Sequence, residues 1–173
     1  DGSDMVFVIV LAKPLSGTYQ SANLARNMLD DSSKVHLFES FSAQVGVEQL
    51  VVLLDNLIRQ DLPSDVIIKK MQNYIDRSRV LITLSTLKSV IRSGRLTSLQ
   101  GFIGTVLRVK PLLEVKEGKL EPFSKARTHS KIAEIIVEDM KERLPENVTR
   151  IYVRLIDKNQ TEIVNNLKSL LEN

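Results

Sequence analysis

The chain has 173 residues, of which 43% are hydrophobic and 26% charged, with a formal net charge of +3, two histidines and no cysteine. This composition describes a globular protein with one ordinary domain or two small ones. It excludes disulfides and thiolate chemistry and argues against a His-rich metal site. No stretch approaches the ~20 apolar residues of a membrane span, and no signal-peptide pattern opens the chain, so we expect a cytoplasmic protein without stable membrane insertion.

The first predicted element is a buried strand over Met5–Leu11, a short apolar run rich in β-branched residues. Pro14 then breaks the chain, Ser16 suits a helix N-cap, and apolar residues continue at helical spacing. A strand that delivers Ser16, Gly17 and Thr18 onto a helix N-terminus brings unpaired N–H groups and two hydroxyls to one point. Such a point suits an anion, because free amides and the helix dipole both favour negative charge. On spacing alone the plainer interpretation, that Ser16 only caps its helix, is the stronger one.

The following segment predicts a strand over Val35–Phe38 and two amphipathic helices. His36 lies inside the apolar run of that strand, which favours a structural over a catalytic role. The first helix spans Val47–Ile58, and four of its residues are expected on one buried face: Leu50, Leu54, Leu57 and Ile58. The second helix is marked by Ile67, Met71, Tyr74 and Ile75.

The second half of the chain again alternates between strand and helix patterns. Strands are expected over residues 79–84, 110–115, 120–123 and 151–156, and helices over residues 86–91, 97–107, 132–144 and 161–171. Lys116-Glu117-Gly118-Lys119 reads as a hairpin turn between the second and third of these strands. The predicted class is therefore α/β, with a mixed α+β second half. We place a domain boundary near Ser78, which gives domains over residues 1–78 and 79–173.

Charge is unevenly distributed along the chain. Residues 88–131 carry ten basic and three acidic residues, whereas residues 1–87 carry eight basic and ten acidic ones. A local basic excess attracts anionic partners. In that segment only Phe102 and Phe123 could stack on bases, and no nucleic-acid-binding motif is present. We therefore expect an acidic protein or a phosphorylated ligand rather than nucleic acid.

Several stretches resemble one known family. Leu15–Ala22 after its apolar strand resembles the DegV family of bacterial fatty-acid-binding proteins. The turn over residues 93–96, Ser-Gly-Arg-Leu, is similar to the family's Gly-Gly-Arg-Ile turn, and residues 102–113 and 114–118 follow in the family's order. The resemblance covers nearly the whole chain and implies a two-domain DegV-like fold, here expected to be incomplete at both ends because the family is longer.

The resemblance also implies a function and a site. Members of the family bind one long-chain fatty acid between two domains and present it to a separate fatty acid kinase, without cofactor or chemistry of their own. On this basis Ser16, Gly17 and Thr18 hold the carboxylate and Arg95 lies near the domain junction. The helix around Gly104 carries a stripe of small residues, although each helical glycine costs ~1 kcal/mol against alanine. Either a neighbouring backbone or the acyl chain approaches there, and the candidate tail contacts are Phe102, Ile103 and Gly104.

Two other functions remain open. The family commonly has two serines before Leu15, where this chain has Ala12-Lys13-Pro14. The chain could therefore be a degenerate interaction module that kept the fold and lost the ligand. An enzyme is the weaker alternative, because the sequence holds no cysteine, no Gly-x-Ser-x-Gly elbow and no His-Glu-x-x-His pair.

Overall fold

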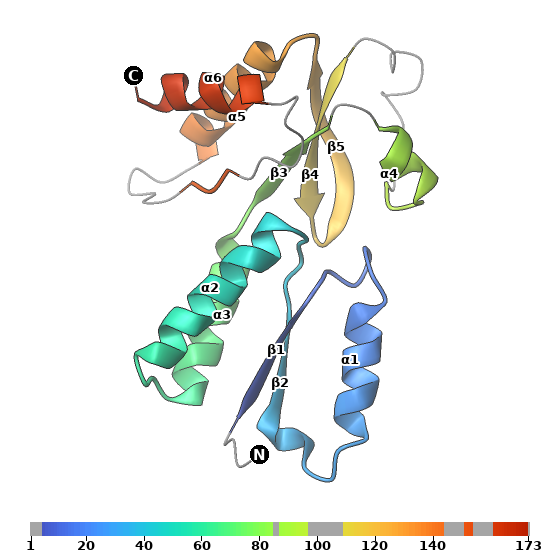
Figure 1. Cartoon of the computed structure of the whole chain (residues 1–173), viewed down its shortest axis with the longest axis vertical. Helices are drawn as coiled ribbons and strands as arrows, with labels where there is room; N and C mark the ends of the chain where they lie inside the picture. Colours follow the sequence, from blue (N-terminus) through green and yellow to red (C-terminus); the bar gives the residue numbers. More distant parts are fainter. Residues whose placement is uncertain (1–4, 85–86, 97–108, 144–150, 154–160, 173) are drawn as a thin grey trace. The chain divides into compact units, whose positions relative to one another are not determined.

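The structure is a computed structural model, which describes residues 5–84, 87–96, 109–143, 151–153 and 161–172 (Figure 1). The chain divides into two compact units. The first comprises Asp1–Val80 with Val115–Leu120, and the second comprises Leu81–Glu114 with Glu121–Asn173. Both units mix helices and strands, which confirms the predicted class. The predicted boundary near Ser78 stays a prediction.

The first unit is built on a parallel pair of strands, β1 (Val6–Val10) and β2 (Val35–Glu39), joined through helix α1 (Thr18–Asn27). Val6 pairs with Val35, and Val10 pairs with Glu39. Because the strands are parallel and in this register, both end at the same edge of the sheet. A short 3-10 helix, η1 (Ser32–Lys34), precedes β2.

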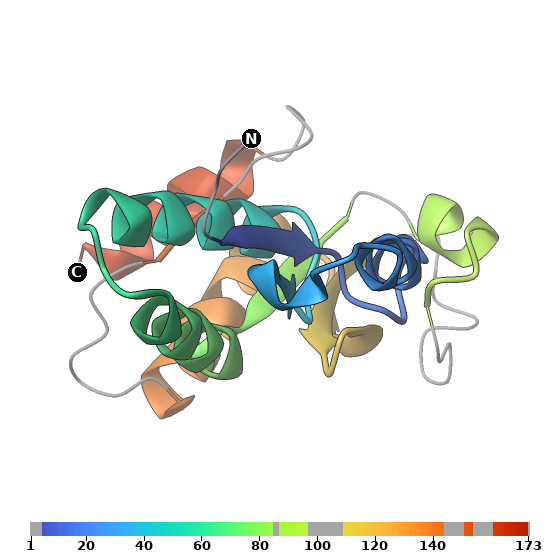
Figure 2. The same cartoon turned by 90° about the horizontal axis from the view of Figure 1, so that it is seen from below.

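Two antiparallel helices complete the first unit: α2 (Val45–Arg59) and α3 (Ser64–Arg77). Figures 1 and 2 show them together on one side of the β1–β2 pair, with α1 on the other. Their apolar faces form a core with Phe38 of β2, as the spacing predicted, whose further buried members are Leu50, Leu54, Leu57, Ile67, Met71 and Ile75. Ile58 is an exception: it is 50% exposed, so its predicted place on the buried face is wrong. It lies at the edge of the apolar stripe, where a rotation of 100° per residue has already turned the side chain outward.

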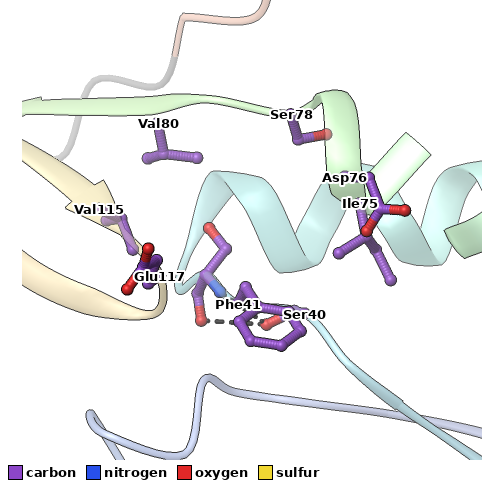
Figure 3. Close-up of a pocket in the computed structure, with 9 residues that line it drawn as sticks. Ser40, Phe41, Ile75, Asp76, Ser78, Val80, Val115 and Glu117 are labelled. Carbon is purple, nitrogen blue, oxygen red and sulfur yellow. Dashed lines mark hydrogen bonds between the residues drawn. The ribbon is translucent and has the colours of Figure 1, made fainter. Parts of the chain in front are cut away.

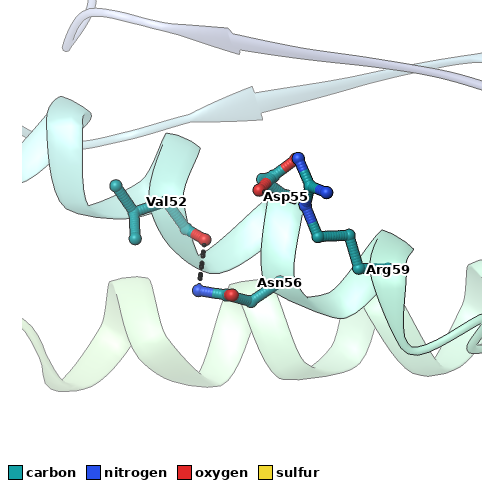
Figure 4. Close-up of polar contacts among 4 residues, drawn as sticks. All are labelled: Val52, Asp55, Asn56 and Arg59. Carbon is teal, nitrogen blue, oxygen red and sulfur yellow. Dashed lines mark hydrogen bonds and ion pairs between the residues drawn. The ribbon is translucent and has the colours of Figure 1, made fainter.

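The outer face of α2 carries local polar contacts (Figure 4). Arg59 Nε lies 2.7 Å from Asp55 Oδ2, and the Asn56 side chain donates to the carbonyl of Val52 at 2.8 Å. The ion pair joins residues four apart on an exposed surface, where such pairs support the helix. These residues are part of a solvated helix face and not of a site.

A three-stranded sheet has the order β3 (Val80–Thr83), β4 (Lys110–Lys116), β5 (Lys119–Ala126). Most of its residues belong to the second unit, whereas Val80 and the segment Val115–Leu120 belong to the first. Glu117 and Gly118 connect β4 to β5 with φ angles of 48° and 75°. Two consecutive residues with positive φ form the turn that matches the twist of a hairpin, so the predicted hairpin is confirmed.

Helices α4 (Lys88–Arg92), α5 (His129–Arg143) and α6 (Thr161–Leu171) complete the second unit. Helices α5 and α6 pack together, and His129 Nδ1 lies 3.4 Å from Glu162 Oε2 where the two helices begin. Their shared core with the sheet comprises Leu112, Ala126, Ile132, Ala133, Val137, Ile163 and Leu167. The strand predicted over residues 151–156 is not found at residues 151–153, which have no regular structure, and residues 154–156 lie outside the described part.

No helix in the described part of the chain is both long and apolar enough to cross a bilayer.

Candidate functional site

The loop between β1 and α1 brings the predicted head-group residues together. The carbonyl of Ala12 accepts hydrogen bonds from the backbone N–H groups of Leu15 and Ser16, at 3.0 and 3.1 Å, so the chain turns tightly after the strand. Ser16 and Thr18 then lie side by side at the start of α1, and their hydroxyls are hydrogen-bonded to each other. Thr18 is exposed and Ser16 is half-buried. The two hydroxyls that were predicted to hold the carboxylate therefore lie together at one accessible point.

The N-terminus of α1 differs from the prediction in one respect. Gly17, not Ser16, is the N-cap residue, and no side chain caps the helix. Ser16 Oγ instead accepts from the backbone N–H of Thr18 at 3.3 Å, a long contact. The first backbone N–H groups of a helix have no intrahelical acceptor, and the first turn of α1 contains no acidic residue. The amide donors and the positive end of the helix dipole are thus not neutralised by a side chain of that turn.

A buried carboxylate holds this loop at the edge of the sheet. Glu39, the last residue of β2, accepts from the backbone N–H of Lys13 through Oε1 at 3.0 Å and pairs with Lys13 Nζ through Oε2 at 2.7 Å. The Glu39 side chain is only 8% exposed, whereas that of Lys13 is 44% exposed. Hydrogen bonding to Glu39 raises the pKa of Lys13, with partial opposition from burial and smaller support from Tyr19. The ammonium also lies 3.8 Å from the centre of the Tyr19 ring, in the first turn of α1.

The loop after β2 lies directly beside the loop after β1. The N–H of Ala12 donates to the carbonyl of Ser42 at 3.0 Å, and the N–H of Ser40 donates to the carbonyl of Val10 at 3.0 Å. Ser40 Oγ accepts from the N–H of Ser42 at 3.1 Å and donates to its carbonyl at 3.0 Å, which closes a compact turn. Phe41 at the tip of that turn has a φ of 47°, in the left-handed region that non-glycine residues rarely adopt. The two loops therefore form one hydrogen-bonded assembly at the carboxyl end of the sheet.

A pocket of ≈ 260 Å³ adjoins the second loop (Figure 3). Its lining residues come from that loop, from the end of α3 and the residue that caps it, from β3, and from β4 with the hairpin turn: Ser40, Phe41, Ser42, Ile75, Asp76, Ser78, Val80, Val115 and Glu117. Binding pockets for whole organic ligands usually span about 300–1,000 Å³. This pocket is below that range, and two of its polar side chains, Ser40 and Ser78, already bond to backbone carbonyls. It does not by itself provide room for a long-chain lipid.

The remaining predicted site residues belong to other parts of the chain. Arg95 belongs to the second unit, is exposed after α4, and donates through Nη1 to the carbonyl of Ser93 at 3.3 Å. The predicted tail contacts lie outside the described residues: Phe102, Ile103 and Gly104. The basic side chains singled out by pattern are exposed as expected: Arg92, Lys119 and Lys125. Among the described residues, no group of His, Asp and Glu could hold a metal ion.

The sequence interpretation missed the Lys13–Glu39 pair. The two residues are 26 positions apart, so no short motif reports their contact. The contact could have been inferred only from the order and direction of the strands. Lys13 follows the first strand and Glu39 ends the second, and parallel neighbours bring their carboxyl ends to one edge.

The fold and the loop together define a mixed α/β protein with two compact units and a hydroxyl-bearing helix N-terminus beside a parallel strand pair. Comparison with known proteins identifies the family. The model of the DegV family, described as an uncharacterised protein family, matches residues 1–173, and the chain belongs to it. This confirms the resemblance found in the sequence.

Individual relatives agree with this assignment. A DegV domain-containing protein of Caldanaerobacter subterraneus is 30% identical over 97% of this chain and 59% of its own length. A solved structure on fatty acid binding by a DegV family protein of Thermus thermophilus is 28% identical, with a TM-score of 0.73, over 82% of this chain and 50% of that one. The fatty acid kinase (Fak) B3 protein of Streptococcus pneumoniae, solved with linoleic acid, is 27% identical with a TM-score of 0.73, over 82% and 52%. The chain thus spans between half and three-fifths of the length of these relatives.

Proposed function

We propose that this chain binds a long-chain fatty acid, with the carboxylate at the N-terminus of α1, and presents it to a partner fatty acid kinase. One observation carries the proposal: the hydroxyls of Ser16 and Thr18 meet at a helix N-terminus that no side chain caps and no acidic residue neutralises. Membership of the DegV family supports it, because one relative of 28% identity is described by its fatty acid binding and one of 27% identity is loaded with linoleic acid. The protein is then a cytoplasmic carrier with no chemistry of its own.

In this proposal, the first turn of α1 stabilises the negative charge of the carboxylate without a charged side chain of its own. A carboxylate at this point accepts hydrogen bonds from the two hydroxyls and from first-turn N–H groups, and it interacts favourably with the helix dipole. The acyl tail needs an apolar channel that the ≈ 260 Å³ pocket does not supply. The tail contacts remain those proposed from the resemblance: Phe102, Ile103 and Gly104. Arg95 remains a proposed contact near the junction of the two domains, residues 1–78 and 79–173.

The first test is direct. Native mass spectrometry of gently purified protein should show a co-purifying mass in the range of long-chain fatty acids. Delipidated protein should then bind linoleic acid in a calorimetric titration. If neither a bound acid nor titratable binding is found, the carrier proposal is wrong.

Two serine variants, one just before α1 and one within it, test where the carboxylate binds. Ser16→Ala removes one charge-assisted hydrogen bond, worth roughly 1.5–3 kcal/mol, so linoleic acid should bind on the order of ten to one hundred times more weakly. Ser21→Ala is the matched control, because Ser21 Oγ bonds to the carbonyl of Gly17 at 3.3 Å within the helix. Its affinity should match the wild type. A lower melting temperature for Ser16→Ala with unchanged affinity would leave Ser16 a merely structural residue and refute the head-group assignment.

The competing function is an interaction module without a lipid. The observation in its favour is that Ala12 is fully buried and offers no hydroxyl, where the family commonly has serines. A module of this kind would still fold and still bind a protein partner. It would carry no fatty acid in the mass spectrum and show no calorimetric response to linoleic acid.

A further inference from the structure

We propose that Lys13 is a specificity-determining residue of this site, contacting the ligand carboxylate with an ammonium that Glu39 holds in place. This inference rests on the proposed function. It adds a cation to a site otherwise made of hydroxyls and backbone amides, and it predicts that the site selects ionised acids over uncharged lipids of the same length.

The position of the Lys13 ammonium near the start of α1 is the first part of the argument. Lys13 lies three residues before Ser16 in the tight turn whose N–H groups converge on the carbonyl of Ala12. Its Nζ lies 3.8 Å from the centre of the Tyr19 ring, and Tyr19 is the second residue of α1. The charge is therefore held beside the ring of a residue from the first turn of α1, the turn that also carries the hydroxyl of Thr18. A cation over an aromatic face is attracted by the ring, which limits the directions that the flexible side chain explores.

The number of N–H donors on the Lys13 ammonium is the second part of the argument. An ammonium has three N–H donors. Among the contacts of the described residues, Glu39 Oε2 takes one at 2.7 Å, and the ammonium lies 3.8 Å from the centre of the Tyr19 ring. The Lys13 side chain is 44% exposed, so a third donor can reach an incoming carboxylate oxygen. A neutral hydroxyl or ester at the same place accepts a weaker hydrogen bond, because it carries no charge.

Glu39 acts as a positioning residue. Its side chain is 8% exposed and accepts from both the backbone and the side chain of Lys13. A buried carboxylate that loses its cation is costly, so Lys13 does not leave Glu39 when a ligand binds. The ammonium is instead shared between two carboxylates. Glu39 therefore both orients the cation and weakens its attraction for the ligand.

Because the cation is shared, one variant should change fatty-acid affinity in the opposite direction from the usual loss. Glu39→Gln keeps an oxygen that can accept from the N–H of Lys13 but removes the competing negative charge. Fatty-acid affinity should therefore rise, whereas loss of a purely structural residue would lower it. Lys13→Met keeps the aliphatic stem and removes both the charge and the donors. It should weaken binding of an acid on the order of tenfold more than it weakens binding of an alcohol.

The deciding measurement compares linoleic acid with linoleyl alcohol, a probe with the same tail and no charge, in the full chain. The affinity ratio of acid to alcohol should fall about tenfold in Lys13→Met and rise in Glu39→Gln. Lys13→Met/Glu39→Gln has no unpaired buried charge and should show the same fallen ratio if the single variant folds poorly. An unchanged ratio in the lysine variants, with wild-type acid binding intact, overturns the role of Lys13. A lowered ratio in Glu39→Gln overturns the shared-cation account. If wild-type protein binds neither probe, the proposed function itself fails.

Discussion

Replacing Gly46 by alanine should destabilise the first unit, although alanine is the better helix former. Gly46 is the second residue of α2. A Cβ atom there would lie 2.1 Å from Ser42 Oγ, 2.8 Å from Ser42 Cβ and 3.1 Å from Val80 Cγ2. Ser42 Oγ can rotate away, but its Cβ moves only with the backbone of a turn that is fixed by hydrogen bonds to Ala12 and Ser40. Overpacking of this kind typically costs about 1–3 kcal/mol, against a helix-propensity gain of at most ~1 kcal/mol.

The net expectation for Gly46→Ala is a loss of about 1–2 kcal/mol, or a fall of roughly 2–8 °C in melting temperature for a chain of this size. Urea unfolding followed by circular dichroism measures the loss. Gly17→Ser is the control, because nothing lies within 4 Å of a Cβ atom added there; its stability should equal or exceed that of the wild type. Ser42→Gly added to Gly46→Ala removes both of the nearest clashing atoms and should recover much of the loss. If Gly46→Ala is as stable as the wild type, the close approach of Ser42 is not a constraint.

Three further outcomes are expected. Burial, and then the charge of Arg26, lower the pKa of His36 from about 6.5. The folded state therefore favours the neutral ring, and this contribution to stability is complete above pH 6.5 and is lost as the pH falls below it. His36→Gln should flatten that part of the curve in urea titrations from about pH 5 to 8. Gly118→Ala should lower the melting temperature more than Gly94→Ala. Both positions have positive φ, but only at Gly118 would a Cβ also meet Ala12 Cβ, at 3.0 Å. A triple charge reversal should slow association with the partner kinase in stopped-flow experiments, most at low ionic strength, and leave fatty-acid affinity unchanged. The three exposed cations are Arg92, Lys119 and Lys125. If the wild type and the triple variant associate with the kinase at the same rate at every salt concentration, these cations belong to a solvated face and not to a docking surface.

Periodicity predicted most of the regular structure because its physical cause is local. Leu50, Leu54 and Leu57 are spaced four and three residues apart, as on one face of a helix, and they are buried in α2. The Glu117-Gly118 turn was visible for a similar local reason, since glycine readily adopts the positive φ found at Gly118. Ile151–Val153 shows the limit of this reasoning, because an apolar, β-branched run forms a strand only where another strand pairs with it.

The candidate site was only partly visible in the sequence. Placing two hydroxyls at the start of α1 followed from strand, turn and helix signals in consecutive residues. The exact cap did not, because Ser16 and Gly17 are both good N-cap residues and differ by one position. The Lys13–Glu39 pair depends on which strands are neighbours, a long-range property that composition and spacing do not encode.

The hairpin turn between β4 and β5 has a consequence for the order of folding. Val115–Leu120 belongs to the first compact unit, whose other part ends at Val80, and Gly118 packs close to Ala12 and Pro14. The first unit therefore depends on a contact that spans about 100 residues of chain, and closing such distant contacts slows folding. During synthesis from the N-terminus, β1, β2 and their helices emerge long before this hairpin does. We expect the first unit to wait, partly formed, until residue 120 has left the ribosome.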